Sequence, residues 1–217
     1  MKTCILIFND GRNDYLEQTL KSLFENVEFG DTYKILIDDV PEGRELKYLE
    51  SVKKRYKINK LVLNDENLGV FGSVQKAWGL IPKDCTHVWH QENDFLFNEK
   101  IDFQAMVRAA DHKHIFQVAL LRQPWFAFEK KAGSIYNAYS GFKDARVADN
   151  NLVLHKEYFT HNPCLYRVEF ANQVNGYDEY KYIKHLLSKN TNGWSAYMGT
   201  TKDAPKITHI GEQKYVR

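Results

Sequence analysis

The sequence predicts an α/β protein built on a doubly wound, mostly parallel sheet flanked by helices. Short apolar runs alternate with helical patterns through the first half of the chain, and each run ends in polar residues. Buried parallel strands are continuous apolar runs, and repeated strand–helix units predict right-handed crossovers between parallel strands. With 217 residues, the chain suits one domain and is long enough to bury a sizeable core without disulfides.

Four strands and three helices are expected in the first half of the chain. Each strand is a short apolar run that ends at a turn or a polar cluster. The helices show apolar residues at helical spacing or a charged surface pattern. The expected strands are 4–8, 35–37, 61–63 and 86–90. The expected helices are 16–24, 46–56 and 70–81.

The alternation loosens after Asp94. Apolar spacing predicts a helix over 103–110, and a strong apolar run predicts a strand over 115–121. Helices are also expected over 165–174 and 180–187, and a last strand over 207–210. The segment 122–156 is rich in aromatic residues, glycine and charge, and we expect it to be irregular. A loop of that length in a compact domain is usually functional.

Composition narrows the class of protein. A net charge of +2 weakens the case for a dedicated nucleic-acid-binding module, although a local basic groove stays open. The cysteines Cys4, Cys85 and Cys164 are too scattered for a disulfide framework or a zinc cluster. The sequence shows no secretory signal pattern and no apolar run near the length of a membrane span, which predicts a cytoplasmic protein without a membrane partner. The motifs of P-loop enzymes, HExxH metalloproteases and GxSxG hydrolases are missing.

Polar residues follow each of the first four expected strands. In an open parallel sheet, ligands bind outside the carboxyl ends of the strands. Glu92 and Asp94 are separated by one residue on a short turn, so both carboxylates can face one cation. Mg²⁺ and Mn²⁺ take few protein carboxylates together with substrate phosphates. The strand-end residues are Asn9, Asp10, Arg12, Asp38, Asp39, Asn67, Glu92 and Asp94.

The order of these motifs resembles the GT-A glycosyltransferases related to family 2. The motifs are Asn9-Asp10-Gly11-Arg12, Ile37-Asp38-Asp39, Asn67-Leu68-Gly69 and His90-Gln91-Glu92-Asn93-Asp94. The resemblance covers about residues 3–100 and 175–211, and it implies a single Rossmann-like GT-A domain over 1–217. Residues 1–98 would form the half that binds a UDP-sugar, and residues 99–217 the half that binds an acceptor.

The resemblance also implies roles for single residues on the donor side. Asp38 or Asp39 would read the nucleotide base, while Glu92 and Asp94 would anchor a Mn²⁺ or Mg²⁺ ion that bridges the diphosphate. His209, which precedes Ile210-Gly211, resembles a further ligand of the metal or the diphosphate. Glutamate stands at position 92 where the family has aspartate, which leaves the metal preference open. The other donor-side candidates are Phe8, Asn9, Arg12, Asn67, Gly69, Gly72 and Arg122.

On the acceptor side, the resemblance implies a carboxylate base for an inverting transfer. Such a base takes the proton of the acceptor hydroxyl as the new bond forms. Asp178 and Glu179 open a predicted helix, and we prefer Glu179 because Asp178 suits the N-cap position. The alternative is that both residues only cap the helix.

Two segments of the middle, 121–133 and 159–163, resemble small phage-encoded GT-A enzymes. Some of these are thought to glycosylate hydroxymethylated bases in phage DNA. Arg122 would then steady the diphosphate, and Trp125, Phe126 and Phe128 would stack an acceptor base or sugar. The alternative for the aromatic residues is packing under a long loop. Modified DNA in the cytoplasm of a phage's host is therefore one expected acceptor, and a glycan or a small molecule is another.

Other functions stay open beside this one. A glycan-directed glycosyltransferase would use the same donor site. A sugar nucleotidyltransferase would carry a glycine-rich phosphate loop with Arg and Lys after the first strand, where only Asn9-Asp10-Gly11-Arg12 stands. A GT-A-shaped binding protein without catalysis would bind nucleotide and leave the donor intact. The sequence does not predict the sugar, the acceptor or the oligomeric state.

Overall fold

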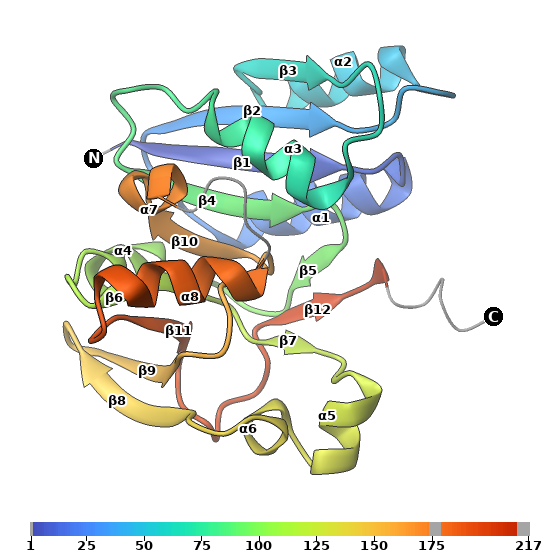
Figure 1. Ribbon diagram of the computed structural model, residues 1–217. Helices are drawn as coiled ribbons and strands as arrows, with labels where there is room; N and C mark the ends of the chain where they lie inside the picture. The colour runs from blue at the N-terminus through green and yellow to red at the C-terminus, as the bar shows by residue number, and fades with distance from the viewer. Residues whose placement is uncertain (1, 174–178, 212–217) are drawn as a thin grey trace.

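The computed structural model describes residues 2–173 and 179–211, with the backbone alone at 179–180. The main sheet is built, in chain order, from β1 (Thr3–Asn9), β2 (Thr32–Asp38), β3 (Lys60–Leu63), β4 (His87–Glu92), β6 (Ile115–Ala119), β8 (Lys143–Val147), β9 (Asn150–His155), β10 (Cys164–Arg167) and β11 (Trp194–Met198). Their order across the sheet is β3-β2-β1-β4-β10-β6-β11-β9-β8 (Figure 1). A smaller sheet has the order β5-β12-β7, formed by β5 (Phe95–Phe97), β12 (Ile207–His209) and β7 (Arg122–Gln123).

The first four strands form the parallel half of the main sheet. β1 pairs in parallel with β2 and with β4, and β2 pairs in parallel with β3. The register places Asn9 opposite Asp38 and Phe8 opposite Glu92, so the carboxyl ends of these strands are level. This half confirms the expected α/β class and brings the predicted strand-end residues to one edge.

The second half of the main sheet is mixed. β10 lies antiparallel between β4 and β6, and β11 is parallel to β6. β9 and β8 then extend the sheet in antiparallel pairings. The small sheet lies beside the carboxyl ends of β1 and β4, because β5 follows β4 after a two-residue turn (Figure 1).

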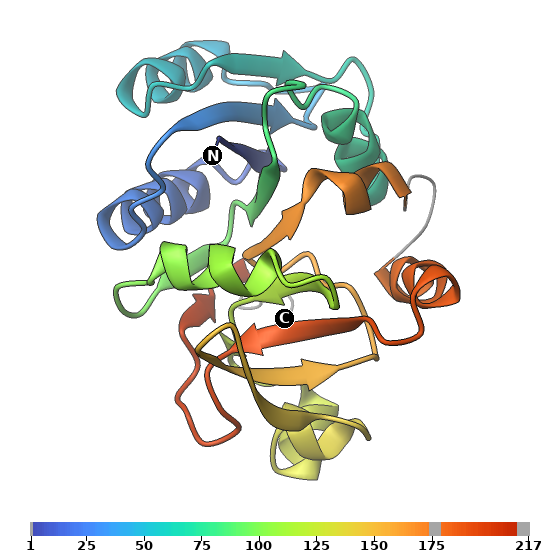
Figure 2. The same cartoon turned by 90° about the vertical axis from the view of Figure 1, so that its left-hand side faces the viewer.

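Helices cover both faces of the main sheet, as Figures 1 and 2 show from two directions. One face carries α1 (Asn13–Asn26), α2 (Leu46–Arg55) and α4 (Phe103–Ala110), and the other carries α3 (Gly69–Trp78), α7 (Val168–Gln173) and α8 (Glu179–Lys189). α1 forms because Leu16, Leu20 and Leu23 recur at helical spacing, and all three are fully buried against the sheet. Each face therefore has its own apolar core. Two short helices, α5 (Ala127–Ala132) and α6 (Ile135–Ala138), lie beyond the sheet.

Two expectations for the second half differ from the structure. The segment 122–156, expected to be irregular, contains β7, α5, α6, β8 and β9. The helix expected over 165–174 is a strand at its start, since β10 ends at Arg167 and α7 begins only at Val168. Short apolar runs do not distinguish a buried strand from a buried helix. In this protein the segment forms a strand because it pairs with β4 on one side and with β6 on the other.

The described part of the chain contains no helix that is both long and apolar enough to cross a lipid bilayer.

Candidate active site

A cavity of about 350 Å³ opens at the carboxyl ends of β1 and β4. Strand ends from the parallel half, the start of α3 and the last described residues of the chain form its walls. Its lining residues are Phe8, Asn9, Asp10, Arg12, Asp39, Asn67, Gly69, Val70, Ser73, Glu92, Asn93, Asp94, His209 and Gly211. The structure thus brings most of the sequence-predicted donor residues into one cavity.

The turn after β4 is fixed from three sides. The Thr19 hydroxyl of α1 donates to the backbone oxygen of Asn93 at 2.8 Å and accepts from the backbone N–H of Phe95 at 3.1 Å. The Asn93 side-chain amide donates to Asn9 Oδ1 and to Asp10 Oδ1, at 3.0 and 2.8 Å. The backbone N–H of Ile210 donates to the backbone oxygen of Asp94 at 2.8 Å. These bonds hold Glu92 and Asp94 in place before any ligand binds.

Asp94 lies between two basic side chains of the cavity. Its Oδ2 accepts from Arg12 Nη2 at 2.8 Å and lies 3.1 Å from His209 Nε2. Burial alone would raise the pKa of Asp94, but His209 and then Arg12 outweigh burial and lower it. The other oxygen, Oδ1, is buried and has no hydrogen-bond partner among the described residues. Asp94 is therefore ionised at neutral pH and has one carboxylate oxygen to offer.

Arg12 forms ion pairs with two acids, Asp10 and Asp94. Its Nε donates to both oxygens of Asp10, at 2.8 and 2.7 Å, and its Nη2 donates to Asp94. Burial would lower the pKa of Arg12, but the hydrogen bond with Asp10 and the charges of Asp94 and Asp10 raise it. The guanidinium thus stays charged on the floor of the cavity.

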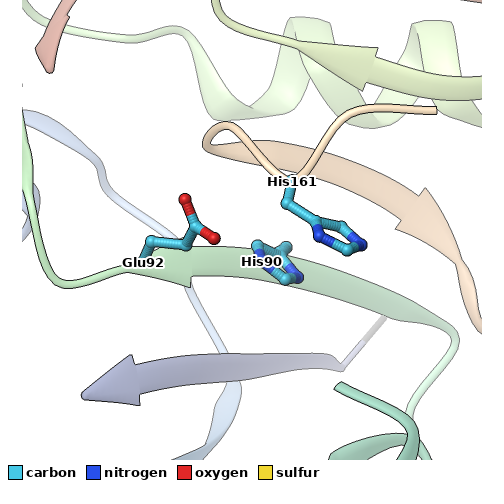
Figure 3. Close-up of side chains that lie close together, drawn as sticks. All are labelled: His90, Glu92 and His161. Carbon is cyan, nitrogen blue, oxygen red and sulfur yellow. The ribbon is translucent and has the colours of Figure 1, made fainter. Parts of the chain in front are cut away.

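Glu92 has different neighbours from the Asp94–His209 pair. It groups with two histidines, His90 and His161, and one ligand atom from each of the three residues lies within 4.8 Å of the others. Figure 3 shows His90 and Glu92 on β4, with His161 reaching over from the loop before β10. Burial lowers the pKa of His161 to about 4 and holds that of His90 well below its usual range, so both rings are neutral.

The two acids after β2 have different surroundings. Asp38 is almost fully buried, accepts from Asn9 Nδ2 at 2.7 Å and from Arg44 Nε at 2.7 Å, and does not line the cavity. Asp39 lines the cavity, and its Oδ1 accepts from Asn64 Nδ2 and from the backbone N–H of Leu68, both at 2.8 Å. The geometry therefore favours Asp39 for contact with a bound base and places Asp38 behind Asn9.

The loop into α3 supplies the opposite wall. Asn67 Oδ1 accepts from the backbone N–H of Gly69 at 3.0 Å, and Gly69 has a φ of 65°, a region that glycine adopts without strain. Both residues line the cavity. Gly72 lies on α3 against Leu68, where a Cβ would come within 2.8 Å of the leucine Cβ, and it is not among the lining residues. We infer that Gly72 serves the packing of this loop on the helix.

A second cavity of about 290 Å³ adjoins the first. The two share Val70, Glu92 and His209. Phe71 of α3 and Phe126 at the start of α5 also line it, and both residues are 43% exposed. The second cavity is lined by Val70, Phe71, Glu92, Phe95, Arg122, Phe126, His161, Asn162 and His209.

Arg122 lies in the second cavity and outside the first. Its guanidinium pairs with the buried Glu129 at 3.1 Å, donates to the backbone oxygen of Pro124 at 2.6 Å and stacks 3.6 Å from the centre of the Phe126 ring. Among the aromatic candidates, Phe126 lines this cavity, while Trp125 packs edge-on against Tyr136 and Phe128 is half exposed beside Phe126.

The two candidates for the base are not placed in full. Asp178 lies outside the described residues, and Glu179 is described in its backbone alone, as the first residue of α8. Their role as base stays a prediction.

Several residues of the site were not singled out from the sequence. Thr19 and Asn93 fix the turn that carries the acids, and Ser73 and Val70 complete the wall formed by α3. Gly211 fits against the Asp94–Arg12 pair so closely that a Cβ there would overlap the Asp94 carboxylate. The sequence signal for Gly211 was its place directly after the His209 strand.

Comparison with known proteins gives a likeness of fold. No family model and no curated protein sequence matches the chain. Among solved structures, GalNAc-T7 with UDP, GalNAc and Mn²⁺ superposes with a TM-score of 0.69 at 12% identity, over 97% of this chain and 44% of that one. The mannosyltransferase PcManGT from Pyrobaculum calidifontis, in complex with GDP-Man and Mn²⁺, gives 0.62 at 11% identity, over 94% and 58%.

A third structure, S. aureus TarS 1-349 in complex with UDP-GlcNAc, gives a TM-score of 0.59 at 12% identity, over 95% of this chain and 60% of that one. The chain thus spans about half the length of the structures that it resembles. At these identities the likeness concerns the fold. The chain has the GT-A fold that these nucleotide-sugar-binding proteins share.

Proposed function

We propose that the protein is a metal-dependent glycosyltransferase that moves a sugar from a UDP-sugar to an acceptor hydroxyl. The observation that carries the proposal is the charge of the first cavity. Among its described lining residues, the acids Asp10, Asp39, Glu92 and Asp94 face one arginine, Arg12, which is already paired with two of them. A diphosphate would be repelled there without a cation, and a divalent ion removes that repulsion.

The residues present fit such an ion. The buried, unpartnered Oδ1 of Asp94 offers a carboxylate oxygen, and Glu92 and His209 line the same cavity. We assign the ion to Asp94, Glu92 and His209. The two carboxylates suit Mn²⁺ or Mg²⁺, and the imidazole of His209 favours the transition metal Mn²⁺. When bound, the ion supplies charge stabilisation to the leaving diphosphate.

The nucleotide is assigned to the other end of the cavity. Asp39, after β2, and Asn67, before α3, line this part of the cavity. Phe8 and Asn9, at the end of β1, line it as well. Asp38 acts indirectly, through Asn9. It accepts one hydrogen bond from the Asn9 side-chain amide and another from Arg44. Arg12 orients Asp94 and places positive charge beside the diphosphate. The chain's contribution is thus a preorganised site, which needs little rearrangement when the donor binds.

The second cavity is our proposed acceptor site. It meets the donor cavity at Val70, Glu92 and His209, so an acceptor bound there would reach the sugar end of the donor. The exposed rings of Phe71 and Phe126 give a stacking surface for a sugar ring or a base. Glu179, or Asp178, would take the proton of the acceptor hydroxyl, and the anomeric centre would invert.

Two acceptor classes fit a cavity with aromatic walls: a hydroxymethylated base in phage DNA, and a glycan. A donor screen followed by product analysis separates them. We expect one UDP-sugar to raise the melting temperature only when Mn²⁺ is present. With that donor, mass spectrometry should find one added sugar on either a glycan panel or hydroxymethylated DNA. A protein that is stabilised by no nucleotide-sugar, with or without Mn²⁺, would contradict the proposal.

A Gly211→Ala substitution should impair the site without unfolding the protein. The added Cβ overlaps the Asp94 carboxylate and displaces it from Arg12. A displacement of this kind, of about 1 Å, costs roughly 100-fold in rate. The measurement is kcat/KM for the donor. Gly79→Ala is the matched control, because a Cβ at Gly79 makes an ordinary contact with the backbone oxygen of Lys76 at 3.5 Å. If the two variants have equal kcat/KM, Gly211 is not part of the site.

A further inference from the structure

His90, Glu92 and His161 form a cluster that the proposed donor site does not explain. His90 and Glu92 are two residues apart on β4, so their side chains leave the same face of the strand. His161 precedes β10, whose Cys164 lies opposite His90 in the neighbouring strand. One ligand atom from each residue lies within 4.8 Å of the other two. The fold thus brings together groups that are about seventy residues apart in the chain.

The chemistry of the cluster is that of a transition-metal site. Two imidazoles and one carboxylate are the ligands of catalytic Zn²⁺ and of non-haem Fe²⁺ sites, whereas Mg²⁺ prefers oxygen ligands alone. His90 is 1% exposed, and its Nε2 is buried without a hydrogen-bond partner in the part of the chain that the structure describes. Leaving such a group unsatisfied is unfavourable, and a metal ion would satisfy it.

The arrangement also shows what binding requires. The rings of His90 and His161 are stacked, with centroids 4.9 Å apart and planes at 12°. An ion shared by both rings needs one of them to turn. His90 is fixed on β4 and stacks on its other side against Phe8 at 4.7 Å. His161 lies on a loop and is the ring that turns.

We propose that His90, Glu92 and His161 bind one divalent transition-metal ion of the Zn²⁺ or Co²⁺ class, separate from the Asp94–His209 pair. Three protein ligands leave a coordination position open. Glu92 and His161 both line the second cavity, so the open position faces that side. Glu92 lies between the two ion sites and belongs to both donor sets.

The experiment is a titration of the full chain with Co²⁺ without nucleotide, followed by the visible absorption of the bound ion. The site variants are His161→Ala and Glu92→Gln. The controls are Asp94→Asn, which alters the donor-site acid, and His112→Ala, which breaks up the half-buried His112–His114 pair, whose ring centroids are 5.6 Å apart. Circular dichroism checks that each variant is folded.

We expect one Co²⁺ per chain, because the donor-site ion is held together with the phosphates of a nucleotide that this titration leaves out. The absorption spectrum should be typical of imidazole ligands, and Zn²⁺ should displace the ion. Each site variant should lose about 100-fold or more in affinity, as losing a direct ligand costs at least as much as losing a supporting group. Both controls should bind as the unmodified protein does. If His161→Ala does not fold, Glu92→Gln carries the comparison.

The site assignment is wrong if no stoichiometric Co²⁺ binds, or if both site variants retain it. It is equally wrong if Asp94→Asn or His112→Ala abolishes binding, because the ion would then lie elsewhere. The titration contains no donor and measures no turnover, so its failure is distinct from a failure of the proposed sugar transfer.

Discussion

Replacing Asp94 by asparagine should abolish sugar transfer while leaving the fold intact. The substitution keeps the size of the side chain and removes the charge that faces Arg12, His209 and the proposed cation. Loss of a direct metal ligand removes several kcal/mol of transition-state stabilisation, and about 4 kcal/mol corresponds to roughly a 1,000-fold lower rate. The measurement is kcat/KM with the donor found in the screen, at saturating Mn²⁺.

Asp14→Asn is the matched control for Asp94→Asn. Asp14 is exposed on the first turn of α1, two residues after Arg12, and does not line the cavity. We expect its activity to equal that of the unmodified protein. An Asp94→Asn enzyme that retains activity in the presence of a chelator would show that the metal assignment is wrong.

Replacing Arg122 by alanine should cause a large loss of stability. The Arg122 and Glu129 side chains are 5% and 1% exposed, and their charged groups pair at 3.1 Å. Glu129 also accepts from the backbone N–H of Phe126 at 2.6 Å, so the pair holds the start of α5. Removing one partner leaves a buried charge alone, which typically costs about 3–5 kcal/mol. The free energy of unfolding in urea, followed by circular dichroism, measures the loss.

Arg146→Ala provides the comparison, because Arg146 and Asp149 form an exposed pair at 3.9 Å. The free energy of unfolding of that variant should lie within about 0.5 kcal/mol of the value for the unmodified protein. The double variant Arg122→Ala, Glu129→Ala should lose less stability than the sum of the losses in the two single variants. If Arg122→Ala is as stable as Arg146→Ala and binds UDP more weakly, Arg122 serves the donor, as its sequence context first implied.

The residues of the proposed donor site were largely predictable because parallel strands end at one edge. Short apolar runs located β1 to β4, and their register carries Asn9, Asp39 and Glu92 to one cavity. The sequence did not separate Asp38 from Asp39. That distinction depends on Arg44, which reaches back to Asp38 from the loop before α2.

The second half of the chain was less predictable because its contacts are long-range. β10 has an apolar composition compatible with a helix, and only its place between β4 and β6 makes it a strand. The same placement brings His161 to His90, a contact for which no local pattern gives a signal. Short elements such as α5 are stabilised by a buried ion pair instead of a periodic apolar face. Sequence periodicity therefore does not detect them.

The release of free UDP from a UDP-sugar is the most direct test of the central claim, which is that the acidic cavity binds a nucleotide-sugar through a divalent cation. Without an acceptor, we expect slow UDP release in Mn²⁺, none after addition of a chelator, and recovery when Mn²⁺ is restored. The Asp94→Asn variant should release none under any of these conditions. UDP release that is equally fast with chelator present, or its absence with every UDP-sugar and metal tested, would contradict the account.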